Sequence, residues 1–327
     1  MQNRRFRTRF TAPETDAVEL MDNPDPVTIA FTIGSRRLLR FDRHLIDIAY
    51  SLDDLTQGQR PRPAGGIDDA RSRDGLRILS APPSDIAYWR AQFPRYRFGA
   101  VQHYRHHFIT MEGGYEAYLA RFSGKTRSTL RRKRRRFEKA DGGRLDLRTY
   151  RGEAEIAAFL DLAAPLARRT YQARLLDAAL PDDAQSRRAI LAAAARDEVR
   201  AFLLFLKGEP VAYLYLPIDG TTLIYAYLGY DPDHADLSPG TVLQMAALES
   251  LFAEERFTQF DFTEGDGAHK ALFGTDSLPC CSFVLLEPHW RNATILAAYT
   301  AFEGAVDAGK RIIRGRAENW VRRALNR

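Results

Sequence analysis

The residues best suited to chemistry stand where a helix is predicted to begin, in the run Ser238-Pro239-Gly240-Thr241. Apolar residues recur after this run at three- and four-residue steps, which indicates a helix. Ser238 suits its N-cap and Pro239 its first helical position. The first amides of a helix have no internal partner and bind anions, phosphate above all, and Gly240 admits a ligand because it has no Cβ. The sequence therefore predicts an anion site here, with a plain helix cap as the alternative.

Two predicted strands frame this helix. A run rich in Thr, Ile, Leu and Tyr, residues 221–230, precedes it after a loop, and residues 257–263 follow it. A crossover helix usually joins parallel strands. The expected unit is strand, loop, helix, strand, with the anion site at the start of the helix.

Short motifs in a fixed order extend this unit. They are Gly229-Tyr230-Asp231-Pro232, Ser238-Pro239-Gly240-Thr241, Phe260-Asp261-Phe262, Gly265-Asp266, His269-Lys270 and Phe273-Gly274. The ordered set resembles the acyl-CoA half-site of the GNAT acyltransferase superfamily, in the branch of the Fem-type peptidoglycan aminoacyl ligases and the CelD-like acetyltransferases. The resemblance covers residues 115–287. The usual GNAT pyrophosphate loop carries a Gln or Arg and two small residues, where this chain has only the Ser-Pro-Gly-Thr run.

The resemblance implies transfer of an acyl group from acyl-CoA, as co-substrate, to an amine. The thioester carbonyl would be held by backbone N–H groups where strands 221–230 and 257–263 part. A base must take the amine's proton. The candidates lie after the second strand and are, in order of preference, Asp261 and Glu264, then Asp266 and His269.

Three further side chains are candidates for the same reaction. Lys270 is expected to hold a substrate carboxylate or phosphate, or to stabilise the oxyanion. Tyr227 and Tyr230 are expected to donate a proton to the leaving thiolate or to line the pocket. A strand-end Asp is often a turn former and a strand Tyr is usually packing, so each role has a structural alternative.

Composition sets the broad class. The chain has 327 residues, 45% of them hydrophobic, which is ample for packed cores. No apolar run approaches the ~20 residues that span a bilayer, and the basic N-terminus lacks the apolar region of a signal peptide. The two cysteines, Cys280 and Cys281, are adjacent and give no disulfide framework. A cytoplasmic setting is expected, and the net charge of +6 suits anionic partners.

The strongest local charge lies in residues 115–139, which end in a run of Arg and Lys. Apolar residues at helical spacing predict one or two amphipathic helices with a cationic face. This face is either merely solvated, a clamp for phosphates, or a surface for anionic lipid or nucleic acid. The resembled families often carry a similar basic helix, so DNA is not expected as a partner.

Three histidines, His103, His106 and His107, fall in one extended segment, residues 96–110. Strand alternation places His103 and His107 on one side and His106 on the other. No carboxylate or cysteine stands near them in the sequence. No metal site is therefore expected.

The remaining pattern predicts an α/β (α+β) fold with two GNAT-like lobes, mixed sheets flanked by helices, joined by the basic helices. The lobes are residues 1–140 and 141–327. Further strands are predicted at 27–33, 37–41, 76–80, 144–150, 199–207, 210–217 and 281–286. Further helices are predicted at 44–55, 83–93, 153–172, 184–196 and 294–325. The last is amphipathic and either packs on its own domain or lies on a membrane or partner.

The expected function is an N-acyltransferase that uses acyl-CoA and a primary amine: an amino sugar, an amino acid or a long-chain amine. The resemblance suggests envelope or polysaccharide pathways. One alternative is a Fem-type ligase that takes aminoacyl-tRNA on the basic helices. Another is a non-catalytic protein that docks on a membrane or nucleic acid.

Overall fold

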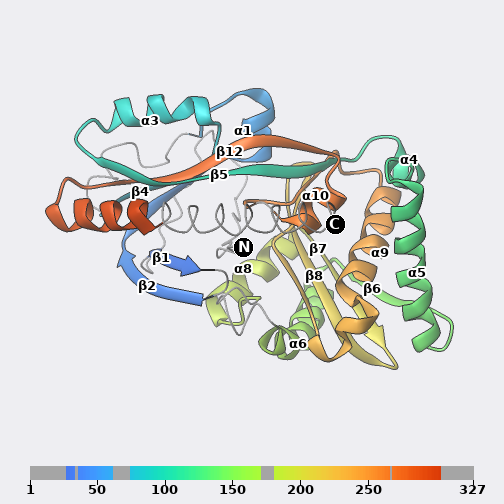
Figure 1. Ribbon diagram of the computed structural model, residues 1–327. Coiled ribbons are helices and arrows are strands. Elements are labelled where there is room, and N and C mark those ends of the chain that lie inside the picture. The colour runs from blue at the N-terminus through green and yellow to red at the C-terminus, as the bar shows by residue number, and fades with distance from the viewer. Residues whose placement is uncertain (1–26, 34–35, 62–73, 171–179, 266, 303–327) are drawn as a thin grey trace, which may run out of the picture. The chain divides into compact units, whose positions relative to one another are not determined.

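The computed structural model describes residues 27–33, 36–61, 74–170, 180–265 and 267–302, in a mixed α/β fold (Figure 1). They group into two compact units. Unit 1 takes in Arg105–Leu278, and unit 2 takes in the described parts of Glu14–Tyr104 and Pro279–Arg327. The boundaries fall inside two long strands, β5 (Arg97–Thr110) and β12 (Asp276–Leu286). They differ from the expected division after residue 140, and the division into two GNAT-like lobes stays a prediction.

Unit 1 is built on a mixed sheet whose strand order is β5-β11-β9-β8-β7-β6, with β10 paired to β8. Among the described residues, β9 and β11 pair in parallel, whereas β10–β8, β11–β5, β6–β7, β7–β8 and β8–β9 pair antiparallel. The strands are β6 Asp146–Tyr150, β7 Val199–Leu206, β8 Glu209–Asp219, β9 Thr222–Ile224, β10 Tyr227–Tyr230 and β11 Gln259–Asp261. The helices are α4 Gly114–Ala120, α5 Gly124–Ala140, α6 Glu153–Arg169, α8 Ala184–Ala195, α9 Pro239–Ala253 and α10 Ala268–Phe273, with a 3-10 turn at Pro232–Leu237.

Helices cover both faces of this sheet (Figure 1). Residues of β7 alternate between two cores: Ala201 and Leu203 pack with α6 and α8, whereas Phe202 and Leu204 pack with α9. All eight residues of β7 are buried, because both of its faces are covered. The β7–β8 hairpin around Gly208 is as predicted. The sheet therefore gives the site a rigid base.

Helix α9 is the central crossover and joins the parallel strands β9 and β11, as predicted. The sequence indicated one apolar stripe, but α9 is buried nearly all round, including Pro239, Gly240 and the run 242–248. A helix that is apolar on every side belongs in a core. Its first turn is consequently fixed by packing against β8, β10 and α5.

Unit 2 is smaller. Its described elements are the hairpin of β1 Val27–Ile33 and β2 Arg36–Arg43, then β3 Leu45–Ala49, α1 Leu52–Gln57, β4 Gly75–Ala81, a 3-10 turn at Pro83–Asp85, α3 Ile86–Gln92, and helical residues 290–302. Strand β4 pairs in parallel with β3 and antiparallel with β12. The rest of the predicted C-terminal helix lies outside the described residues. None of the described helices is long and apolar enough to cross a membrane.

The helix predicted at residues 44–55 is wrong in its first half. Residues Leu45–Ala49 form strand β3, and a helix begins only at Leu52, after the N-cap Ser51. Leu45, Ile46 and Ile48 are all buried, since the strand is covered on both faces. Burial on both faces removes the alternation that marks a strand, and the remaining apolar spacing resembles a helix.

Candidate active site

Two neighbouring strands part at the centre of unit 1. Strands β9 and β11 pair as far as Ile224 and Asp261, and Tyr225 N–H then donates to Asp261 O at 2.8 Å. Beyond this point β10 pairs with β8, while Phe262 N–H donates to His107 O on β5 at 3.1 Å. The predicted strand 221–230 is thus two strands with a break at Tyr225. The resemblance implied a parting between strands 221–230 and 257–263, and its position at Tyr225 comes from the structure.

The start of α9 lies beside this gap. Ser238 occupies the N-cap position as predicted, but with φ of 54° and with no side-chain cap. Its carbonyl oxygen instead accepts the N–H groups of Thr241 and Val242, each at 3.1 Å. A Cβ on Gly240 would lie 3.2 Å from Cδ1 of Tyr230 and 3.3 Å from Cδ2 of Leu228. The glycine therefore serves the packing of β10 against α9, and its part in ligand binding stays a prediction.

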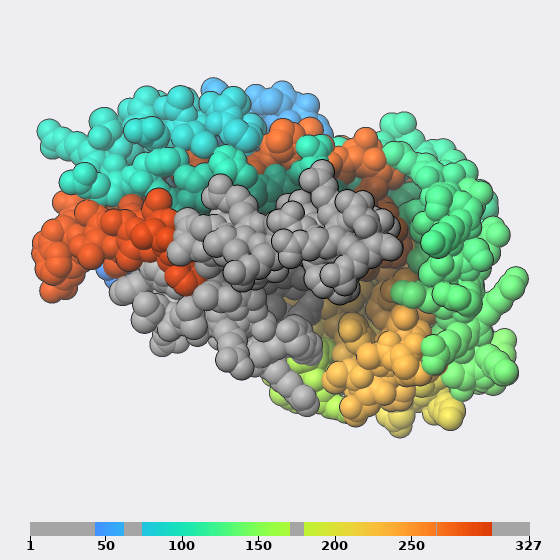
Figure 2. All heavy atoms as spheres, viewed as in Figure 1, coloured from blue at the N-terminus to red at the C-terminus, as the bar shows by residue number. Residues whose placement is uncertain are grey.

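A lysine from the basic run reaches the same helix start. Helices α5 and α9 lie side by side, and Lys133 Nζ donates to Thr241 Oγ1 at 3.3 Å. Figure 2 shows α5 in green at the surface, beside α9 in orange. Arg134 pairs with Glu249 at 2.7 Å and Arg136 with Asp236 at 2.9 Å. The run is thus partly a set of ion pairs, and Lys133 places a cation at the predicted anion site.

A polar cluster lies behind the start of α9, in which Gln244 is fully buried and His269 and Tyr225 are half-buried. His269 Nε2 on α10 contacts Gln244 Oε1 on α9 and lies 3.4 Å from Tyr225 Oη at the strand break. Burial is the main cause that lowers the pKa of His269 to about 4, and the charges of Lys270 and Lys133 contribute to the same shift. His269 is therefore neutral near pH 7. Burial raises the pKa of Tyr225, which keeps its phenol protonated.

Asp261, the first base candidate, is buried and already bonded. Its Oδ1 lies 2.5 Å from His106 Nε2 and accepts Thr263 N–H at 2.6 Å. Thr263 has φ of 62°, an unusual conformation that this bond helps to hold. Lys270 Nζ donates to the backbone carbonyls of Thr263 and Glu264 in the same turn. Asp261 thus shapes the turn after β11, and Lys270 is fastened to it.

The other predicted residues are spread out. Tyr227 is buried on the α6–α8 side of the sheet, opposite Tyr215, whereas Tyr230 is 40% exposed and lies against α9. The structure does not bring these two tyrosines together. Glu264 is half-buried with its carbonyl bonded to Lys270. Asp266 lies outside the described residues.

Sequence reasoning missed four contributors: His106 as the partner of Asp261, Tyr225, Lys133 and Gln244. His106 was seen only as a metal candidate, and it is bonded to Asp261 instead. His107 is buried and His103 exposed. Within the described residues, no group of three or more His, Cys, Asp or Glu is arranged to hold a metal ion. Of these four, Gln244 could have been found from the sequence, because it is a polar residue inside the apolar pattern of α9.

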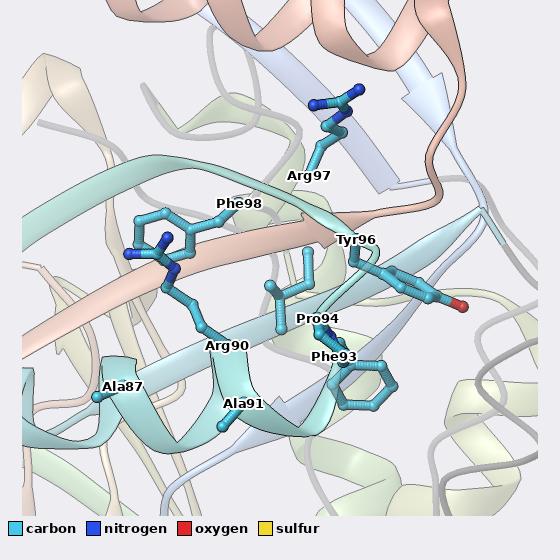
Figure 3. Close-up of a pocket in the computed structure, with 9 residues that line it drawn as sticks. Ala87, Arg90, Ala91, Phe93, Pro94, Tyr96, Arg97 and Phe98 are labelled. Carbon is cyan, nitrogen blue, oxygen red and sulfur yellow. The ribbon is translucent and has the colours of Figure 1, made fainter.

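A cavity of about 640 Å³ lies in unit 2. Helix α3 and the start of β5 line it, with Ala91, Phe93, Phe98 and Leu285 among its apolar walls. In Figure 3, Arg90 extends across the ring of Phe98, with 5.2 Å from its guanidinium carbon to the ring centroid. None of the predicted site residues lines this cavity.

Residues 124–271 match the family model described as an acetyltransferase (GNAT) domain. The match includes the strand break, α9 and His269, and it identifies the chain as carrying a GNAT-type transferase domain. No curated protein matches the chain. The gap, the helix start and the half-buried His269 thus all lie inside the matched span.

Three solved structures are similar in fold. FemX is 13% identical, with 80% of this chain and 88% of that chain covered and a TM-score of 0.48. L-PGS from Bacillus licheniformis is 12% identical, with 85% and 86% covered and a TM-score of 0.46. An aminoglycoside acetyltransferase from an uncultured soil metagenomic sample is 21% identical, with 38% and 82% covered and a TM-score of 0.29. At these identities the similarity concerns the fold and not the substrate.

Proposed function

We propose that this GNAT-type transferase moves an acyl group from acyl-CoA to a primary amine. One observation carries the proposal: β10 and the chain after β11 part directly beside the start of α9, inside the span that matches the acetyltransferase model. A parted pair of strands offers an extended ligand backbone hydrogen bonds. The adjacent helix start offers a place for its phosphates.

The diphosphate of the donor would bind at the start of α9, beside Lys133. The helix dipole is positive there, and a partly buried ammonium strengthens the attraction for an anion. Among the residues that the structure describes, Lys133 bonds to one group, the neutral hydroxyl of Thr241. Its charge is therefore available to a phosphate, unlike the charges of Arg134 and Arg136, which acidic side chains already neutralise.

The acyl group would lie in the gap, with its carbonyl oxygen bonded by backbone N–H groups on the edge of β10 that faces away from β8. The amine nitrogen attacks the thioester carbon, the C–S bond breaks, and CoA leaves as a thiolate. The ammonium proton must leave the amine nitrogen before attack. His269 is the proton acceptor that we favour, because Asp261 is committed to His106 and Thr263. Its pKa of about 4 keeps the ring neutral near pH 7 and also makes it a weak base.

The first test is the melting temperature of the pure protein with and without acyl-CoA. A ligand that binds only the folded state stabilises it in proportion to the logarithm of its concentration. We expect acetyl-CoA or a longer acyl-CoA to raise the melting temperature, by several degrees at 100-fold excess over Kd. The shift should fall in Lys133→Gln. It should persist in Arg132→Gln, because Arg132 is the next residue on α5 and its side chain is exposed.

The outcomes separate the donors. No shift with any acyl-CoA, together with binding of aminoacyl-tRNA, would replace the proposed donor by tRNA. The exposed arginines 131, 132 and 135 on α5 have no acidic partner among the described residues and are what tRNA would contact. A shift that is equal in Lys133→Gln would remove the phosphates from this helix start. The acceptor is then found by CoA release with amino sugars, amino acids and long-chain amines.

A further inference from the structure

Gln244 is a fully buried amide of which one end is unused. Its side chain is on α9, one turn after Gly240, and the residue is 0% exposed. Oε1 contacts His269 Nε2, while Nε2 has no hydrogen-bond partner within the part of the chain that the structure describes. Because His269 contacts only the amide oxygen, the amide nitrogen of Gln244 is the group without an acceptor among the described residues. Buried polar groups are almost always paired, so the spare end requires an explanation.

The position of Gln244 supplies one. Residues four apart on a helix share a side, so Gln244 lies on the same side of α9 as Gly240. That side faces β10, since a Cβ on Gly240 would touch Leu228 and Tyr230. His269, which Gln244 contacts, belongs to α10 and follows β11. Gln244 thus lies between β10 and the segment after β11, at the gap where these two part.

The chemistry of the spare end selects its ligand. With Oε1 taken by His269, the spare end is an N–H donor and needs an oxygen acceptor. The neighbouring groups that act on His269 are the cations Lys133 and Lys270, which are donors themselves. Since no acceptor among the described residues reaches Nε2, we infer that a bound molecule supplies one. An acyl-CoA arm carries two amide carbonyls and a thioester carbonyl, all uncharged acceptors that suit an amide donor.

We propose that Gln244 is a donor-binding residue, whose amide N–H binds a carbonyl oxygen of the acyl donor's arm in the gap beside β10. The inference rests on the proposed function and makes it more specific. The start of α9 and Lys133 would hold the phosphates, and Gln244 would recognise the arm that follows them. Recognition of the arm separates acyl-CoA from nucleotides with the same phosphates.

Two ligands test whether Gln244 recognises the arm while the start of α9 and Lys133 hold the phosphates. CoA carries the arm, and adenosine 3′-phosphate 5′-diphosphate carries the same phosphates without it. Isothermal titration should show that the wild-type protein binds CoA more tightly. In Gln244→Met, which removes the amide, this preference should fall about fivefold to tenfold, as for one buried hydrogen bond. Gln244→Glu keeps an oxygen for His269 but no donor, and should lower the preference too.

The ratio of the two affinities cancels any effect that a variant has on the shared phosphates. Lys133→Gln should weaken both ligands by a similar factor, because both carry the phosphates, and should leave the ratio unchanged within about twofold. A wild-type preference that is unchanged in both Gln244 variants would overturn the inference and leave the proposed function intact. If neither ligand binds the wild-type protein, the proposed function and this inference both fall. Equal melting temperatures of the free proteins control for folding.

Discussion

At the scale of single residues, His269 is the group whose charge the fold controls most directly. Its half-buried ring contacts Gln244 and lies close to Tyr225. Burial and the charges of Lys270 and Lys133 all disfavour the protonated form of the ring. A pKa of about 4 keeps the imidazole unprotonated near pH 7 and also makes it a weak base. The same surrounding has a measurable effect on stability.

The folded protein should lose stability as His269 is forced to charge. Its folded pKa of about 4 lies below the ordinary value of 6.5, so the unfolded chain binds this proton first. The associated stability is fully present above pH 6.5 and is lost as the pH falls toward 4, at most about 1.4 kcal/mol per pH unit. In His269→Gln this part of the slope should disappear from urea unfolding curves measured between pH 7 and 4.

The exposed histidine His103 provides the control for this measurement. His103→Gln should keep the wild-type slope over the same range. A slope that is identical in the wild type and in His269→Gln would mean that the imidazole does not stay neutral in the folded protein. His269 would then no longer be the favoured base.

At the scale of elements, the packing of β8 against β10 depends on a glycine. Gly229 pairs with Tyr213, and a Cβ on Gly229 would lie 2.4–2.7 Å from three atoms of that tyrosine side chain. Tyr213 is fully buried and cannot move aside. Gly229→Ala should therefore destabilise the fold by about 1–3 kcal/mol, the usual range for overpacking.

Chemical denaturation measures this loss, with Gly152→Ala as its control. No other atom lies within 4 Å of a Cβ built on Gly152, so that variant should stay within about 0.5 kcal/mol of the wild type. Equal stabilities of Gly229→Ala and Gly152→Ala would show that the contact between β10 and Tyr213 is looser than described. The gap beside β10 would then lack a fixed wall.

Helices and strands that are marked by local sequence patterns could largely be predicted from the sequence. Turn residues and apolar alternation located the β7–β8 hairpin, and Pro239 with the apolar spacing after it located α9. The break at Tyr225 was not predictable, because β9 and β10 are both made of strand-forming residues and differ only in their partner strands. Pairing partners depend on contacts between distant segments, which a local pattern does not contain.

The same reasoning explains which site residues the sequence located. His269 and Lys270 follow β11 closely, and proximity in the chain was enough to propose them. Lys133 comes from a helix more than a hundred residues earlier and was one cation among many. Gln244 was hidden because the apolar spacing of α9 drew attention to its neighbours. A polar residue in a helix that is buried all round is the signal to look for.

At the scale of the whole molecule, positive charge is concentrated and only partly neutralised. The net charge is +6, and α5 carries three exposed arginines, 131, 132 and 135, without acidic partners among the described residues. Such a surface attracts polyanions in a salt-dependent way without contributing to stability. Lys133 differs from these exposed arginines, because it is half-buried and bonded to Thr241.

Replacing these three arginines by Gln should lower the salt concentration at which the protein elutes from heparin. The melting temperature should change by less than about 2 °C, because exposed unpaired charges contribute little to folding. The shift caused by acyl-CoA should persist. Elution at the wild-type salt concentration would show that the polyanion surface lies elsewhere on the chain.

The two adjacent cysteines make the chemistry convenient to follow. Cys280 and Cys281 are both fully buried, and burial raises the pKa of the Cys281 thiol to about 11. A buried, protonated thiol reacts slowly with disulfide reagents, because the thiolate is the nucleophile. The native enzyme should therefore give almost no background with a chromogenic thiol reagent. With acyl-CoA as the proposed donor, each equivalent of colour that develops during turnover would report one thioester consumed, in real time and without labelled substrate.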